Sequence, residues 1–447
     1  MNRRQFLRNS SLAIAGAAAV TQTPFLVTAH AAPDAPIRIG VVGCGGRGTG
    51  AVLNALGAAT NVVYPGSGYH TEDVARDTRI TATGVQVVAL ADVFPDRLAS
   101  CRDNLSRLGI NIADDHCFTG FDACQKLLAL SEVNYVILAT PPHFRPAQLK
   151  ATIEAGKHAF IEKPAAVDGP GVRTILEAYE LARQKKLGIS AGTQRRHKRG
   201  YIELMKRIHD GEIGEIIYGR CYWNGGEIWV IERQPGWSDM EWQLRNWNYF
   251  TWLSGDHIVE QHVHNLDVMN WGFRAHPIKA SGMGGRQART QPVHGHIYDH
   301  FAVEFEYPGG ARMFSQCRQI NGTEGRVEEY FVGTKGVAGV TNFGGNIYIK
   351  GHDGKLWRYR PNNDPNEYEQ EHRDLIESIR RGGPINEAKD IAESTLAGII
   401  GRESAYSGQS VEWDQAMNST TRLGPARYEF GALPVPPVAI PGKYRFV

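Results

Sequence analysis

Short apolar runs alternate with amphipathic stretches over the first part of the chain. The apolar runs predict buried strands at 37–42, 85–92, 135–140 and 158–162. The stretches between them predict helices at 49–56, 95–108 and 148–155. Strands that alternate with helices are joined by crossover connections, so this order predicts a parallel sheet covered by helices.

The pattern changes after about residue 173. Helices are predicted at 172–185 and 199–210, followed by alternating apolar and polar residues at 301–307 and 312–317. Such alternation indicates antiparallel strands with one face towards water. Two late helices are expected within 369–406, and the Pro-rich last thirty residues predict an arm. The second part of the chain is therefore expected to be an α+β domain.

Length and charge narrow the class of protein. The 447 residues are enough for two domains. Lys and Arg number 49 against 47 for Asp and Glu, and three of the Arg lie in the first 31 residues. A nearly neutral body argues against nucleic acid and against an anionic membrane as partner. The six Cys include no C-x-x-C pair, so neither a zinc knuckle nor a redox dithiol is indicated.

The N-terminus has the features of an export signal. A twin-arginine pattern at residues 2–8 precedes an apolar run at 11–20, and Ala29-His30-Ala31 offers a cleavage site. The run is too short to span a bilayer core of about 30 Å, so no membrane anchor is expected. We predict a signal peptide over 1–31, use of the twin-arginine export machinery, and a periplasmic or secreted protein.

A glycine pattern follows the first predicted strand. Gly43-x-Gly45-x-x-Gly48, with Gly46 and Arg47 inside it, lies between that strand and the next helix. The first glycine permits a tight turn, the second lets the backbone approach a pyrophosphate, and the third lets helix and strand pack closely. The phosphates then lie at the positive end of the helix. The sequence thus predicts a dinucleotide site.

The acid expected to bind the ribose hydroxyls is Asp92, at the end of the second predicted strand. Its charge would repel a 2′-phosphate, which favours NAD over NADP. This acid usually follows the first glycine by about 20 residues, whereas Asp92 follows Gly43 by 49 because of an insertion at 57–84. NAD is therefore the expected cofactor and NADP the alternative.

Three further motifs resemble one family of oxidoreductases. They are Thr140-Pro141-Pro142 with His143 after it, Glu162-Lys163-Pro164, and His264-x-x-Asp267. Their order and separations resemble the glucose–fructose oxidoreductase, inositol dehydrogenase and rhizopine-catabolism family, Gfo/Idh/MocA. The resemblance implies an N-terminal Rossmann domain, expected over 32–165, and a C-terminal α+β domain with a large, mostly antiparallel sheet over 166–447. The late helices within 369–406 could pack back on the Rossmann domain.

The resemblance also assigns roles. Lys163 would lie beside the nicotinamide and the reacting hydroxyl, His264 would be the acid or base, and Glu260 stands where the family usually has Asp. Oxidation of an alcohol needs a base and a cation at one oxygen. Glu260, His264 and Asp267 are spaced to share one face of a helix. The expected catalytic residues are therefore Lys163, Glu260, His264 and Asp267. The motif residues Thr140, Pro141, Pro142, His143, Glu162 and Lys163 would join the glycine loop around the cofactor.

Aromatic residues suggest how a substrate is held. Six of the nine Trp lie between 223 and 252, and one or two of them are expected to face a sugar ring. The other candidate substrate contacts are His262, Tyr298, His300 and Arg145. His257, His262 and His264 crowd together, but their spacing fits no zinc motif and no metal is expected.

These features predict an NAD(P)-dependent oxidoreductase that acts on a hydroxyl of a sugar, glycoside or polyol. An exported enzyme meets little free nicotinamide, so the cofactor is expected to stay tightly bound and to be restored within each turnover. Two alternatives remain open: an NAD-dependent glycoside hydrolase that works by transient oxidation and elimination, and a non-catalytic sensor. Family habit favours a homodimer or homotetramer.

Overall fold

The apolar strands of the first domain form a six-stranded parallel sheet in the order β5-β4-β1-β6-β7-β8. Their side chains are largely buried because helices cover both faces. The strands are β1 Ile37–Val42, β4 Val85–Asp92, β5 Cys117–Thr119, β6 Tyr135–Leu138, β7 His158–Ile161 and β8 Ile189–Ala191. The sheet confirms the predicted Rossmann fold class, and it takes its sixth strand from beyond residue 165, the domain end expected from the sequence.

The computed structural model describes residues 36–58, 60–63, 71–74 and 78–446. The expected signal peptide at 1–31 lies outside these residues. All of these described residues belong to one compact unit. No helix within the described residues is both long and apolar enough to cross a membrane.

Five helices belong to the parallel sheet. They are α1 Gly46–Ala55, α2 Pro95–Arg107, α3 Ala123–Leu128, α4 Arg145–Glu154 and α5 Gly169–Lys185. The side chain of Asp168 caps α5 by accepting a hydrogen bond from the Gly171 N–H at 2.8 Å. A small antiparallel hairpin, β2 Thr60–Val63 and β3 Thr71–Val74, lies between α1 and β4. This hairpin occupies the insertion that separates the glycine loop from Asp92.

The second sheet has nine strands in the order β16-β15-β14-β13-β9-β12-β11-β10-β17. Only the β12–β9 pair is parallel, as expected for a mostly antiparallel sheet. Buried and less buried residues alternate along β12 and β13 because one face is covered. The strands are β9 Ile216–Gly225, β10 Lys279–Gly285, β11 His300–Glu306, β12 Arg312–Gln319, β13 Arg326–Gly333, β14 Gly336–Thr341, β15 Asn346–Gly351, β16 Leu356–Arg358 and β17 Val411–Glu412.

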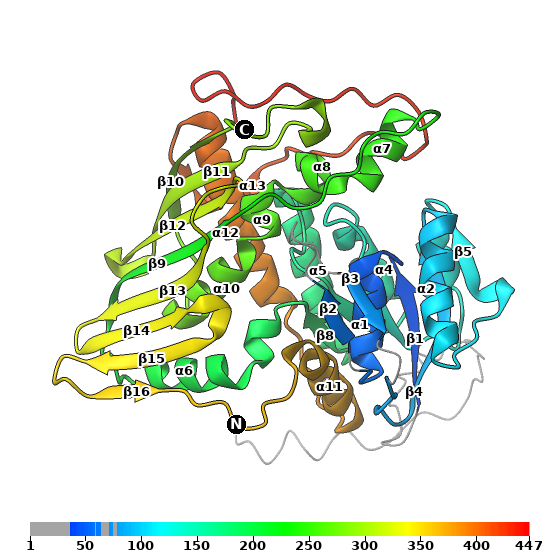
Figure 1. Ribbon diagram of the computed structural model, residues 1–447, viewed down its shortest axis with the longest axis horizontal. Coiled ribbons are helices and arrows are strands. Elements are labelled where there is room, and N and C mark those ends of the chain that lie inside the picture. The colour runs from blue at the N-terminus through cyan, green and yellow to red at the C-terminus, as the bar shows by residue number, and fades with distance from the viewer. Residues whose placement is uncertain (1–35, 59, 64–70, 75–77, 447) are drawn as a thin grey trace, which may run out of the picture. The chain divides into compact units, whose positions relative to one another are not determined.

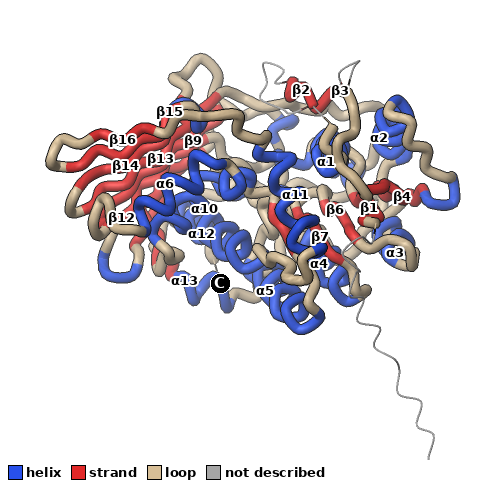
Figure 2. Tube along the Cα trace, turned by 90° about the horizontal axis from the view of Figure 1, so that it is seen from below, coloured by secondary structure: helices blue, strands red, loops and turns tan. Residues whose placement is uncertain are grey.

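Three helices cover one face of the large sheet: α6 Arg199–His209, α10 Val263–Phe273 and α12 Ala388–Ser407 (Figure 2). Helix α12 also packs against α5, so it joins the two sheets into one core (Figure 1). Helix α11, Glu367–Arg380, packs Leu375, Ile376 and Ile379 into the core of the parallel sheet. Both late helices therefore contact the Rossmann domain.

Short helices and an irregular arm complete the chain. The helices are α7 Asp239–Arg245, α8 Thr251–Ser254, α9 His257–Glu260 and α13 Trp413–Asn418. After α13 the chain runs as an extended segment, red in Figure 1, over α7 and α8. Tyr428 in this arm lies 2.8 Å from His143 Nε2, and the Phe430 ring lies 6.0 Å from that of Phe94. The arm therefore contacts the loops that follow the parallel strands.

Candidate active site

The glycine loop connects β1 to α1 and needs its glycines for steric reasons. Gly43 has a φ of +93°, and a Cβ there would lie 2.7 Å from the carbonyl carbon of Ala139. A Cβ on Gly48 would lie 1.7 Å from the Gly43 oxygen, so helix and strand meet too closely for a side chain. A Cβ on Gly45 would meet only an Arg97 nitrogen, at 3.9 Å. The loop is thus tight on its protein side and open where a phosphate would lie.

A cavity of about 710 Å³ begins at this loop and extends towards the large sheet. Most of the residues predicted to hold cofactor or substrate line it. They are Gly43, Gly45, Gly46, Arg47, Asp92, Thr140, Pro141, Arg145, Glu162, Lys163, Glu260 and His264. Gly48, Pro142, His143, His262, Asp267, Tyr298 and His300 are not among the lining residues. The sequence motifs therefore meet at one cavity, which is large enough to be a ligand site.

Asp92 joins the end of β4 to the glycine loop. One carboxylate oxygen accepts from the Cys44 N–H at 2.6 Å and the other from the Phe94 N–H at 2.8 Å. Burial raises the pKa of this carboxyl, while the hydrogen bond from Phe94 opposes that rise. Each oxygen keeps a lone pair, so the carboxylate on the cavity wall can still accept from a hydroxyl.

Lys163 and Glu260 form an ion pair inside the cavity. Lys163 Nζ donates to Glu260 Oε1 at 2.7 Å and to the Glu260 carbonyl at 2.5 Å. The two side chains are 12% and 8% exposed, so water screens the pair only weakly. Glu162 forms the neighbouring pair, accepting from Arg47 Nε at 2.6 Å. The second oxygen of Glu260 has no hydrogen-bond partner among the described residues.

His264 lies against an aromatic ring on the same cavity wall. Its imidazole stacks on Trp223 with ring centroids 5.6 Å apart and an angle of 22° between the planes. The guanidinium of Arg195 lies 5.6 Å from the same Trp223 ring and is held by an ion pair with buried Glu329. The sequence motifs include neither Trp223 nor Arg195. The cluster of Trp residues between 223 and 252 was the one sequence signal that included Trp223, and no signal pointed to Arg195.

Asp267 is not in the cavity, contrary to the expectation of one continuous catalytic helix. Helix α9 ends at Glu260 and α10 begins at Val263, and between them the His262 N–H bonds the His257 carbonyl five residues back. This turn separates Glu260 from α10, whereas His264 and Asp267 both lie on α10, three residues apart. Asp267 is 1% exposed and pairs with Arg196 through contacts of 2.9–3.1 Å. It is a structural partner of Arg196.

Three predicted substrate contacts also lie elsewhere. His262 is fully buried, its Nε2 lies 2.6 Å from Ser315 Oγ, and burial lowers its pKa to about 3. Tyr298 is buried and donates to the Ala439 carbonyl of the arm at 2.9 Å. His300 borders a separate, shallow hollow. None of these side chains lines the main cavity.

Arg145 lines the cavity, but two of its nitrogens donate to carbonyls within the protein. Nε donates to the Thr140 carbonyl at 2.8 Å, and Nη1 donates to the carbonyls of Glu162 and Pro164 at 3.0 and 2.7 Å. Burial lowers its pKa to about 10. Arg145 therefore holds two motif-bearing loops together. His143 also connects separate segments, because its ring packs on Trp252 and its Nε2 forms a hydrogen bond with Tyr428 of the arm.

The Trp-rich segment divides between cavity and core. Trp223, Trp229 and Trp247 line the cavity. Trp242 and Trp252 are buried in a small separate core, and Trp237 packs against that core. Three of the six rings thus line the cavity, and whether one or two of them face a sugar ring stays a prediction.

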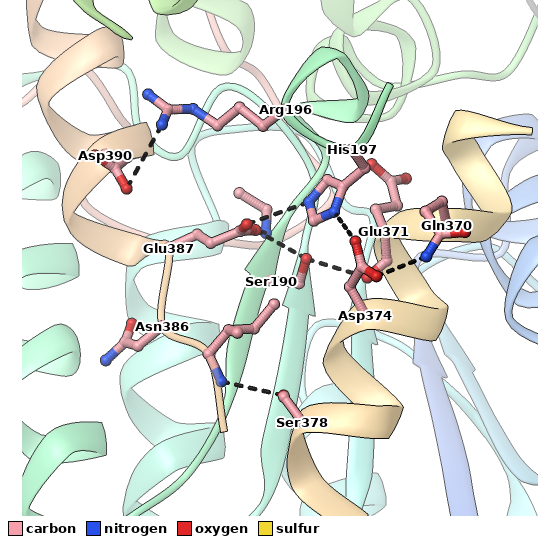
Figure 3. Close-up of polar contacts among 12 residues, drawn as sticks. Ser190, Arg196, His197, Gln370, Glu371, Asp374, Ser378, Asn386, Glu387 and Asp390 are labelled. Carbon is pink, nitrogen blue, oxygen red and sulfur yellow. Dashed lines mark hydrogen bonds and ion pairs between the residues drawn. The ribbon is translucent and has the colours of Figure 1, made fainter. Parts of the chain in front are cut away.

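Ionic and polar side chains gather around His197 in one cluster (Figure 3). His197 ends the short 3₁₀ turn Gln194–His197, its Nδ1 lying 2.6 Å from Asp374 Oδ2 and its Nε2 3.2 Å from Glu387 Oε1. These hydrogen bonds outweigh burial and raise the pKa of His197 to about 10. Because Gln194 and Arg195 on the same turn line the cavity, the cluster fixes part of its wall to α11 and to the start of α12.

The described residues include cysteines and potential metal ligands. All six Cys belong to the described part of the chain and are free thiols. Within residues 36–58, 60–63, 71–74 and 78–446, no cluster of His, Cys, Asp and Glu is arranged to hold a metal ion.

Comparison with known proteins agrees with this arrangement. Residues 37–193 match the model for the Gfo/Idh/MocA oxidoreductase family with an NAD-binding Rossmann fold, and residues 201–338 match that for the Gfo/Idh/MocA C-terminal domain. The chain belongs to this family. Both matches fall on the two sheets that build the cavity.

The individual relatives have low sequence identity to this chain. An inositol 2-dehydrogenase of Pseudomonas syringae pv. syringae is 30% identical over 249 residues, which are 56% of this chain and 64% of that protein. Inositol 2-dehydrogenase 3 of Saccharopolyspora erythraea is 26% identical over 248 residues, 56% of this chain and 63% of that protein. The chain thus spans about half to two thirds of the length of the curated relatives it matches.

Among solved structures, an aldose-aldose oxidoreductase from Caulobacter crescentus superposes with a TM-score of 0.64 at 16% identity, covering 84% of this chain and 99% of that one. A scyllo-inositol dehydrogenase from Lactobacillus casei gives 0.60 at 19% identity, with 85% and 99% covered. At these identities the likeness shows the fold alone.

Proposed function

We propose that this protein is an NAD-dependent oxidoreductase that oxidises or reduces one carbon of a sugar, glycoside or polyol. The observation that carries the proposal is the meeting of Lys163, Glu260 and His264 in the cavity that starts at the glycine loop. A cation and a base beside one dinucleotide site are what alcohol oxidation requires. The family and the inositol dehydrogenase relatives support the same reaction class.

The residues present fit the cofactor. The loop is open at Gly45, the N-terminus of α1 follows it, and Asp92 lies on the same wall for ribose hydroxyls. When bound, NAD supplies the hydride acceptor. We propose NAD over NADP because the Asp92 carboxylate would repel a 2′-phosphate.

Each catalytic side chain has one task. The Lys163 ammonium would lie against the substrate hydroxyl oxygen and stabilise the negative charge that develops there. His264 would take the hydroxyl proton, its ring held in place by Trp223. Glu260 holds Lys163, and its second oxygen remains as an acceptor for a neighbouring hydroxyl.

Neither alternative function gains support. The relatives described above are inositol dehydrogenases, and a solved structure of similar fold is an aldose-aldose oxidoreductase. Lys163 and Glu260 are paired inside the cavity and not at the surface, as a catalytic role requires.

The proposal is tested by mixing purified protein with NAD and a panel of inositols, aldoses and glycosides, and following the absorbance of reduced nicotinamide. Growth of that band with at least one compound, and its loss in Lys163→Met, is the expected result. A complete absence of reduction across the panel, with NAD shown to bind, would favour a sensor.

We also propose that the protein is exported by the twin-arginine route with its cofactor tightly bound. The sequence at 2–8 motivates this, because that route carries folded proteins. Cell fractionation of wild type and of the double variant Arg3→Lys, Arg4→Lys checks it. Retention of the variant in the cytoplasm is expected, and an unchanged distribution would refute export by this route.

The remaining proposal concerns assembly as a homodimer or homotetramer. The three helices that cover the large sheet lie on one of its faces, and the exposed apolar side chains Ile217, Met283 and Leu356 belong to strands of this sheet. Light scattering on the purified protein would give the mass of the assembly, and a monomer mass would refute the proposal.

A further inference from the structure

A second part of the cavity wall is built by the ends of two parallel strands. Gln319 at the end of β12 lies opposite Gly225 at the end of β9. The chain that leaves β9 brings Trp229 to this wall, and the segment after α7 brings Trp247 and Asn248. We call this group of residues the distal wall.

Two aromatic rings form the apolar part of the distal wall. Trp229 and Trp247 have ring centroids 6.0 Å apart with an angle of 56° between their planes. Both line the cavity and are only partly buried. Rings in this arrangement offer large faces, which pack well against the C–H faces of a sugar ring.

Two carboxamides form the polar part. Gln319 and Asn248 are each 1% exposed, and both line the cavity. Gln319 Nε2 and Asn248 Nδ2 have no hydrogen-bond partner among the described residues. A buried donor without an acceptor is costly, so two of them on one cavity wall indicate a ligand that supplies acceptors.

The orientation of the Gln319 amide is fixed from behind. Arg289 is fully buried and its Nη2 donates to Gln319 Oε1. Since a guanidinium can only donate, the amide oxygen must face Arg289 and the NH₂ group must point away from it. The Arg289 guanidinium lies 5.1 Å from the Tyr249 ring, which holds it in place. Arg289 is therefore a positioning residue for the donor of Gln319.

The distal wall favours a neutral, oxygen-rich ligand. Glu227 also lines it, and its Oε2 accepts from Asn321 Nδ2 at 2.9 Å. A carboxylate on this wall would repel an acidic group, while it can accept from hydroxyls. Aromatic faces, amide donors and one carboxylate acceptor together match a saccharide ring with its hydroxyl and ring oxygens.

We propose that the distal wall is a subsite for a second saccharide ring, so that the preferred substrate is a glycoside and not a free monosaccharide or inositol. The reacting ring lies at Lys163 and His264, and the second ring lies between the Trp229–Trp247 pair and the amides of Gln319 and Asn248. This inference rests on the proposed function for the reaction, but the binding it predicts does not require turnover.

The test compares cellobiose, maltose, lactose and melibiose with glucose, galactose and myo-inositol. Calorimetry measures binding to the NAD-loaded protein, and reduction of the bound NAD in a single turnover measures the reaction. At least one disaccharide should bind and react roughly tenfold or more better than every one-ring compound. Trp229→Ala and Asn248→Ala should each remove most of that advantage while changing one-ring turnover less than threefold.

Trp357→Ala is the matched control, since Trp357 lies on β16, packs on Arg207 and is not among the cavity residues. It should keep the full preference for the disaccharide. Disaccharides that bind no better than one-ring compounds, or a preference that survives both wall variants, would overturn the subsite. Binding of a disaccharide that depends on Trp229, without turnover of any compound, would support the subsite and refute the proposed reaction.

Discussion

The ion pairs of His197 contribute to stability by an amount that the structure bounds. Contact with Asp374 and Glu387 raises its pKa from the usual value of about 6.5 to about 10. At about 1.4 kcal/mol per pH unit, the upper limit is about 5 kcal/mol. The Asp374 side chain is 36% exposed, so water screens its ion pair with His197 and the contribution to stability is smaller than this limit. We expect His197→Gln to lower the free energy of unfolding by about 2–3 kcal/mol at pH 6.

The pH dependence follows from the direction of the shift. Because the folded pKa lies above the unfolded one, the stabilisation is complete below about pH 6.5 and is lost as pH rises towards about 10. Urea unfolding of wild type and His197→Gln at pH 6, 8 and 9.5 measures the difference. The gap should narrow steadily as pH rises. His352→Gln, a change at an exposed histidine, is the control and should show no gap. A gap of equal size at all three pH values would refute the ion-pair account.

Three further predictions concern the cavity. Gly48→Ala should abolish NAD binding or folding, because its Cβ would lie 1.7 Å from the Gly43 oxygen; circular dichroism and NAD titration separate the two, and normal NAD affinity would contradict the loop geometry. Lys163→Met should lower kcat by at least 10²-fold with little change in NAD affinity, as measured by steady-state kinetics and fluorescence titration; near-normal kcat would exclude it from the chemistry. Trp223→Ala should lower kcat more than it raises KM, since His264 loses the ring on which it stacks; a change in KM alone would assign Trp223 to substrate binding.

The sequence predicted the parts of the site that depend on local chain geometry. The glycine loop, Asp92 at the end of β4 and Lys163 after β7 all lie at the carboxyl ends of parallel strands, which a strand pattern and a motif locate together. The two-sheet architecture followed from the change of period along the chain. The glycine loop, Asp92 and Lys163 could be predicted because each is encoded within a few consecutive residues.

The errors came from contacts between distant segments. The wide turn at His262 breaks the helical spacing between Glu260 and Asp267, and Asp267 pairs with Arg196 from another segment. Tyr298 is covered by the arm, more than a hundred residues later in the chain. No periodicity in one segment reveals which distant residue will meet it.

Transfer of deuterium tests the central claim most directly. The protein is incubated with NAD and a polyol or glycoside deuterated at its carbinol carbons, and the mass of the reduced cofactor is measured. The account predicts that one deuterium appears on the nicotinamide ring with wild type and none with Lys163→Met. Consumption of the labelled compound without deuterium in the cofactor would contradict hydride transfer and the function proposed for this protein.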